Sequence, residues 1–183
     1  TADDRWRGRT IACIASGPSL TADDCARVRA DGVPTIAVNN AGLDMAAFRD
    51  IHHAGDARWW RAHPEAVAPG VLCTSLMGRP PAGVALLQHT GQRNFDPRRW
   101  CLRSGANSGY QAVHLAAHFR PRRIIMLGYD MQPTGGQLHH HGDHEAPLTN
   151  PTNRNFETWL GRFRTLAGPL RSRGIEVINC SRA

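Results

Sequence analysis

A length of 183 residues, of which 41% are hydrophobic, predicts one globular domain spanning residues 1–183. The formal net charge is +7, and because every basic residue is an arginine the chain has no P-loop lysine, Schiff-base lysine or lysine nucleophile. No apolar run approaches the roughly 18 residues that cross a bilayer and no signal-peptide pattern opens the chain, so we expect a cytoplasmic protein with no membrane span.

The first half of the chain alternates short apolar runs with helical segments. The apolar runs predict buried parallel strands at 9–15, 33–38, 50–56, 71–74 and 84–88. Thr21 is a good N-cap for a helix ending near residue 32, and a second helix is expected to begin at Ala57. Residues 89–104 show no clear period and are expected to form a loop.

The second half contains the strongest helix patterns. A strand is expected at 122–127 and another at 175–179, with a helix at 110–119 before them. Apolar residues at helical spacing predict a long helix over 156–170, which Gly168-Pro169 should kink or interrupt. Alternating strands and helices predict an α/β fold, a single-domain Rossmann-like, mostly parallel sheet with helices on both faces. In such folds ligands bind outside the carboxyl ends of the strands.

The first candidate site is the turn between the strand at 9–15 and the helix that follows. Ser16, Gly17, Pro18 and Ser19 form this turn. Free backbone N–H groups and a helix N-terminus favour an anion there, and Gly17 allows a phosphate to approach closely. The alternative is a tight turn with a capping serine.

A second small-residue loop opens the helix at 110–119 and is placed to hold another part of the same nucleotide. Its candidate binding residues are Arg103, Ser104, Gly105, Asn107, Ser108 and Gly109. At other strand ends, the amides of Asn39 and Asn40 can hydrogen-bond a base or a sugar, and Asp56 is a further nucleotide-binding candidate. The alternatives are a capped helix start for the loop and ordinary turn residues for the asparagines.

The richest cluster of polar residues is the segment 139–145, which contains four histidines. Imidazoles suit general acid–base catalysis, and the candidate catalytic residues are His144, His141, Asp143 and Asp130. The same histidines could ligate zinc. Magnesium held by Asp56, Asp130 and Asp143 is a further alternative, and so is a solvated, flexible histidine loop.

Five short motifs lie across nearly the whole chain: Gly17-Pro18-Ser19-Leu20, Val38-Asn39-Asn40, Ser108-Gly109-Tyr110, Leu127-Gly128-Tyr129-Asp130 and the histidine-rich segment 139–145. On these motifs the chain resembles a superfamily that contains the DUF115 proteins, which are archaeal 6-hydroxymethylpterin diphosphokinase-like, and bacterial sialyltransferases. It also resembles uncharacterised proteins encoded by phages and prophages.

The two branches of this superfamily imply different chemistry. A sialyltransferase-like protein would work without metal and use His144 or His141 as the general base. Its cytidine nucleotide would be bound by Ser16, Gly17, Asn39, Asn107 and Ser108. A diphosphokinase-like protein would hold magnesium on Asp56, Asp130 or Asp143 and transfer diphosphate from ATP to a small hydroxylated acceptor.

Three hypotheses follow. The first is a nucleotide-dependent transferase, more glycosyltransferase-like than diphosphokinase-like, that carries a group from a nucleotide-sugar donor to a hydroxyl of a small acceptor. The second is a non-catalytic phage protein that binds nucleotides or nucleic acid, in line with the net charge of +7. The third is a histidine loop that holds a divalent metal for structural reasons.

Overall fold

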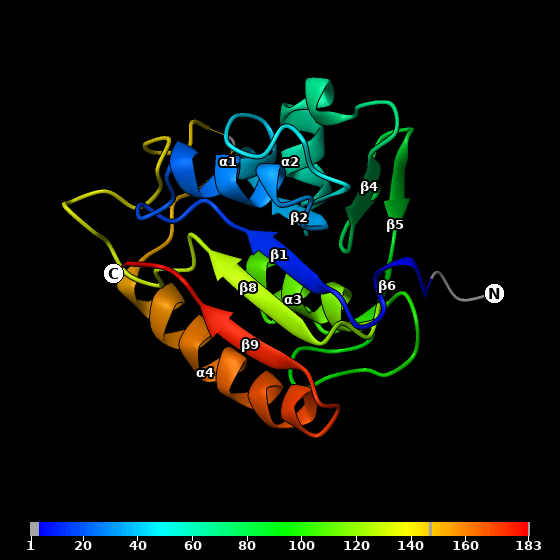
Figure 1. The fold of residues 1–183 in the computed structure, drawn as a ribbon. Helices are drawn as coiled ribbons and strands as arrows, with labels where there is room; N and C mark the ends of the chain where they lie inside the picture. The colour runs from blue at the N-terminus through cyan, green and yellow to red at the C-terminus, as the bar shows by residue number, and fades with distance from the viewer. Residues whose placement is uncertain (1–3, 147, 183) are drawn as a thin grey trace.

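The computed structural model, which describes residues 4–146 and 148–182, contains a seven-stranded sheet flanked by helices (Figure 1). The strands of this sheet are β1 (Thr10–Ile14), β2 (Thr35–Val38), β3 (Ile51–His53), β4 (Leu72–Ser75), β5 (Val84–Leu86), β8 (Arg123–Leu127) and β9 (Glu176–Asn179). They lie in the order β5-β4-β3-β2-β1-β8-β9, and each neighbouring pair is parallel. The predicted Rossmann-like α/β fold with a parallel sheet is confirmed.

Helices cover both faces of the sheet, as the sequence predicts. The helices are α1 (Ala22–Ala30), α2 (Ala57–Ala62), α3 (Ser108–Ala117) and α4 (Asn153–Arg171), with short 3₁₀ turns η1 (Asp4–Trp6), η2 (Asn39–Gly42) and η3 (Pro64–Ala66). Because side chains alternate along a strand, Ile11 and Ile36 pack toward α3 and α4, whereas Ile14 and Ala37 pack toward α1. Figure 1 shows α1 and α2 on one side of the sheet and α3 and α4 on the other. No helix within the described part of the chain is long and apolar enough to cross a membrane.

The helices begin at side-chain caps that the sequence supplies. The hydroxyl of Thr21 accepts a hydrogen bond from the N–H of Asp24 at 3.2 Å and starts α1. Asp56 and Asn107 cap α2 and α3 in the same way. Each cap satisfies an N–H group that a helix cannot bond internally, so the caps fix where each helix leaves its strand-end loop.

Two local expectations differ from the structure. Pro169 does not interrupt α4, which continues to Arg171. Proline sits in the last turn there, where few residues remain to be disturbed by its missing N–H group. Residues 89–104, expected to form a loop, contain part of a small parallel pair made of β6 (Gln88–His89) and β7 (Cys101–Leu102).

The order of the strands reverses at β1. The chain runs outward from β1 to β5 on one side and then returns to place β8 and β9 on the other side. The loops that leave β1 and β8 start side by side at the same edge of the sheet and lead to helices on opposite faces. In sheets of this kind that arrangement opens a crevice in which ligands bind.

Candidate functional site

A cleft lies at the carboxyl ends of β1 and β8, where the strand order reverses. It consists of three adjoining hollows of about 110, 240 and 160 Å³, all lined by Asn39, Ser108 and His144. The loop after β1, the start of α3 and the histidine-rich segment thus meet around one space. This is the edge of the sheet at which the strand-end rule predicts a ligand.

The loops that follow β1 and β8 touch because two glycines remove side chains between them. A Cβ atom on Gly17 would collide with the carboxylate of Asp130 and the carbonyl of Gly128. Gly128 has a φ of +68°, and its carbonyl accepts a hydrogen bond from the N–H of Gly17 at 2.9 Å. Glycine at both positions lets the two strand ends approach closely.

Asp130 places a carboxylate beside the first candidate loop. Its Oδ2 atom accepts a hydrogen bond from the N–H of Ser19 at 3.2 Å, and its Oδ1 atom is buried with no hydrogen-bond partner among the described residues. Asp130 lines the first hollow together with Ser16 and Gly17. A negative charge here disfavours a phosphate and favours a hydroxyl donor, so this end of the cleft suits a sugar better than an anion.

The start of α3 differs from the Asp130 end of the cleft, because its N–H groups favour an anion. The side chain of Asn107 accepts from the N–H of Tyr110 at 2.9 Å, and the hydroxyl oxygen of Ser108 accepts from the N–H of Gly55 at 3.1 Å. Ser108 and Gly109 line the cleft in the first helical turn, whose N–H groups find no acceptor within the helix. These N–H groups and the helix dipole make this end of the cleft suitable for an anion.

The histidine-rich segment is fixed over the cleft by backbone and side-chain bonds. The N–H of His140 donates to the carbonyl of Ser16 at 3.0 Å, and the His140 ring donates from Nε2 to Asp44 at 3.0 Å. Further along, the N–H of His144 donates to the side chain of Asn150 at 2.8 Å. The segment is therefore anchored at both ends, in contrast to the alternative of a solvated, flexible loop.

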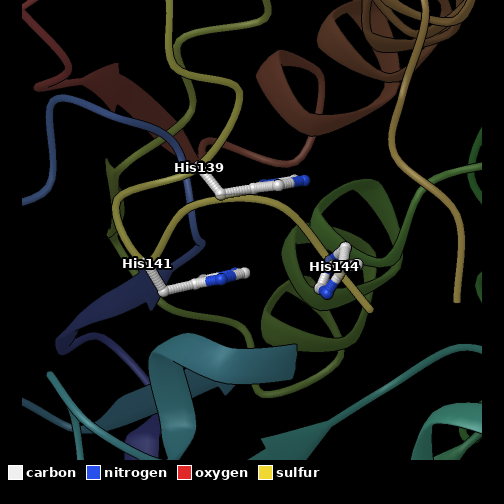
Figure 2. Close-up of side chains that lie close together, drawn as sticks. All are labelled: His139, His141 and His144. Atoms are coloured by element: carbon white, nitrogen blue, oxygen red, sulfur yellow. The ribbon is translucent and has the colours of Figure 1, made fainter. Parts of the chain in front are cut away.

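His139, His141 and His144 converge on one another. Each offers a ring nitrogen, and these three atoms all lie within 4.8 Å of one another. The rings of His139 and His141 stack with centroids 5.0 Å apart, and His144 lies across their ends, 4.7 and 4.9 Å away (Figure 2). We call these three residues the histidine triad.

Burial keeps the histidine triad uncharged. Burial first, and the neighbouring imidazoles second, lower the pKa of His139 and of His141 to about 4. Burial, with His63 nearby, also lowers the pKa of His144. At neutral pH each ring is an imidazole with a free lone pair, which can accept a proton or bind a metal ion.

The structure brings most of the predicted site residues together. Those that line the cleft are Ser16, Gly17, Pro18, Asn39, Asp56, Asn107, Ser108, Gly109, Asp130 and His144. His141 joins the cleft indirectly, through the triad. The sequence rule that strand ends and helix starts meet at one edge accounts for this set.

Other predicted residues have structural roles away from the three hollows. The Arg103 guanidinium contacts the carbonyl of Thr90 and the carboxylate of Asp96, so it is not a phosphate partner in this cleft. Asn40 accepts a hydrogen bond from the Trp59 indole. Ser19, Ser104 and Gly105 do not line the hollows either.

The three aspartates considered as magnesium ligands do not converge. Asp56 caps α2 and forms an ion pair with Arg58 at 2.7 Å, and Asp143 is exposed. Among the described residues, the histidine triad is the group of three metal-ligating side chains that does converge. The geometry therefore does not support a carboxylate site for magnesium.

Some residues that line the cleft are not among the candidates that the sequence singles out one by one. His139 belongs to the triad and lines two of the hollows, and Trp159 of α4 lines the same two. His139–His141 form a turn, closed by a hydrogen bond from the N–H of Gly142 to the carbonyl of His139 at 3.2 Å, so no strand or helix period in the sequence singles out His139. Trp159 lies on the apolar face of a helix and is easily assigned to the core.

Comparison of the chain with protein-family models, with curated proteins and with solved structures gave no match.

Proposed function

We propose that the protein is a transferase that binds a nucleotide or nucleotide-sugar donor in the cleft and passes the donor's sugar to a hydroxyl group of a small acceptor. The observation that supports this most is the polarity of the cleft. N–H groups at the start of α3 favour an anion, Asp130 favours a hydroxyl, and His144 lines the space together with both.

The donor's phosphate is assigned to the α3 end. Ser108 and Gly109 carry the first-turn N–H groups, and the hydroxyl of Ser108 keeps its hydrogen for donation because its oxygen accepts from Gly55. As the bond between the sugar and the phosphate breaks, negative charge grows on the phosphate oxygen. The helix N-terminus stabilises that charge where it develops.

The sugar hydroxyls are assigned to the Asp130 end. The unpartnered, buried Oδ1 atom of Asp130 needs a hydrogen-bond donor, and a ribose or sugar hydroxyl supplies one. Asn39, which lines all three hollows, offers a side-chain amide between the two ends. The acceptor would then enter from the side of the histidine triad, whose lone pairs take the proton of its hydroxyl as the new bond forms.

A thermal-shift panel tests this proposal. CMP, CMP-sugar, UDP-sugar, ATP and GTP are each tested with and without magnesium. A ligand at about 100 times its dissociation constant adds about 2.7 kcal/mol to the free energy of unfolding, which is a readily measured shift. We expect stabilisation by a nucleotide or nucleotide-sugar that does not require magnesium, and slow release of free nucleotide from the nucleotide-sugar.

Two matched variants link the shift to the cleft. Asp130→Asn removes the carboxylate that lines the first hollow, and we expect it to weaken the nucleotide-induced shift. Asp31→Asn makes the same change at an exposed position outside the cleft and should leave the shift unchanged. Absence of stabilisation by every nucleotide, or equal shifts in both variants, would contradict the proposal.

A further inference from the structure

We propose that His139, His141 and His144 bind one transition-metal ion of the zinc type, with a fourth coordination position open to the cleft. Their ring nitrogens lie within 4.8 Å of one another, on a single anchored segment (Figure 2). This site is separate in its chemistry from the aspartates considered for magnesium. It also differs from a purely structural metal, whose ligand set is closed.

Two ring nitrogens of the histidine triad lack a hydrogen-bond partner within the described part of the chain. The Nε2 atoms of His139 and His141 are both buried and have no hydrogen-bond partner among the described residues. A buried polar nitrogen without a partner loses its bond to water and gains nothing in return, so it destabilises the folded protein. A metal ion shared by these stacked rings would satisfy both nitrogens together.

The donor set selects the kind of metal. Three neutral imidazoles and no carboxylate suit zinc and its transition-metal neighbours, whereas magnesium and calcium prefer oxygen ligands. Tetrahedral zinc with bonds of about 2.0–2.1 Å places its nitrogen ligands about 3.3 Å apart. Small side-chain rotations bring nitrogens that lie within 4.8 Å to that separation.

The fourth histidine of the segment holds the three ligands in place. In the run His139-His140-His141 the outer two rings stack, while His140 turns away and donates to Asp44. The His140 N–H also bonds the carbonyl of Ser16, which fixes the segment to the end of β1. At the other end Asn150 holds the backbone of His144. The ligands are therefore preorganised by contacts that do not involve the metal.

Three protein ligands leave one position of a tetrahedral ion for water or for an oxygen of a bound molecule. His139 and His144 both line the cleft beside Ser108 and Asn39, so this open position faces the space assigned to the substrates. That the acceptor oxygen binds there rests on the proposed function, because it requires the acceptor to enter this cleft. Metal binding itself does not depend on it. In the metal-bound form the imidazole lone pairs are used for coordination, so the ion, rather than a free imidazole, would lower the pKa of the acceptor hydroxyl and its proton would pass to water.

Metal titration tests the site. The 183-residue chain without a histidine tag is treated with a chelator, dialysed and titrated with Zn²⁺ by calorimetry and with Co²⁺ by visible absorption. We expect one ion per chain and the strong absorption of tetrahedral cobalt. His139→Ala, His141→Ala and His144→Ala should each lose stoichiometric binding, while His89→Ala, an exposed histidine on β6, should retain it. Absence of stoichiometric binding, or binding that survives all three substitutions, would overturn the proposal.

Two further experiments test the role of His140 and separate metal binding from nucleotide binding. His140→Ala keeps all three ligands but removes an anchor, so we expect metal affinity to fall about 10- to 100-fold. Circular dichroism checks that each variant is folded. Nucleotide binding is measured separately in chelated protein: nucleotide binding without metal binding overturns only the metal site, and metal binding without nucleotide binding overturns only the transferase.

Discussion

Gly17 shows how a single residue sets the shape of the cleft. Its missing side chain lets the loop after β1 lie against Gly128 and Asp130. We expect Gly17→Ala to lower the free energy of unfolding by about 1–3 kcal/mol, because a Cβ atom there would push apart two strand ends whose backbones are in contact. Urea unfolding measures this change.

Gly161 provides the matched control. It lies in α4, and a Cβ atom at this position would meet nothing within 4 Å, so Gly161→Ala should raise the free energy of unfolding. The expected gain is about 0.5–1 kcal/mol, because alanine loses less conformational freedom than glycine in a helix. If Gly17→Ala also stabilises the protein, the close contact of Gly17 with Gly128 and Asp130 is contradicted.

Single site residues can be predicted from the sequence when their position relative to a strand or helix decides where they lie. Gly17, Asn39 and Ser108 follow strands or open a helix, and parallel strands bring such positions to one edge. His139 cannot be singled out in this way, because the segment that contains it has no period. Its direction is set by the bonds of His140 to Ser16 and Asp44, which join residues far apart in the sequence.

Among the elements, α4 forms where the sequence predicts a long helix, but it is not interrupted at Pro169. Proline in a helix interior costs about 3 kcal/mol relative to alanine, yet α4 continues through Pro169 to Arg171. Leu166 and Leu170 are buried on either side of it, and their packing against the sheet and α3 compensates for the lost hydrogen bond.

Pro169→Ala should therefore stabilise the protein. Alanine restores an N–H group that can bond the carbonyl four residues earlier, and we expect a gain of up to about 3 kcal/mol, reduced by the position near the helix end. Equilibrium urea unfolding gives the size of the change. A loss of stability would mean that the proline ring makes packing contacts that outweigh its effect on the helix.

The small strand pair also lies beyond sequence reasoning, for a different reason. Gln88 donates from its N–H to the carbonyl of Trp100 at 2.9 Å, and Thr90 donates to Leu102 at 3.0 Å. These strands have two residues each, too few to produce an alternating pattern. Only the long-range pairing defines them, whereas β1, β2 and β8 are continuous apolar runs that are recognisable locally.

In the molecule as a whole, the same parallel sheet that forms the site also encloses titratable groups in its core. His52 and His53 on β3 and His114 on α3 are fully buried. Burial lowers the pKa of each to about 4 from an ordinary value of 6.5, so the folded protein keeps all three uncharged. The ring of His53 donates from Nε2 to the side chain of Gln111 at 2.8 Å, which links β3 to α3 in this neutral state.

These histidines predict a loss of stability in acid. Below pH 6.5 the unfolded chain binds protons that the folded protein does not, so the contribution of each histidine is complete above pH 6.5 and is lost as the pH falls toward about 4. The full effect is at most roughly 3 kcal/mol per group. Urea unfolding at several pH values should show His114→Gln and His53→Gln with a shallower decline than the parent protein, and His89→Gln, an exposed position, with the same decline. Because the comparison is between slopes, contributions from other groups cancel. Equal slopes in all four proteins would show that the buried histidines do not determine the acid sensitivity of the fold.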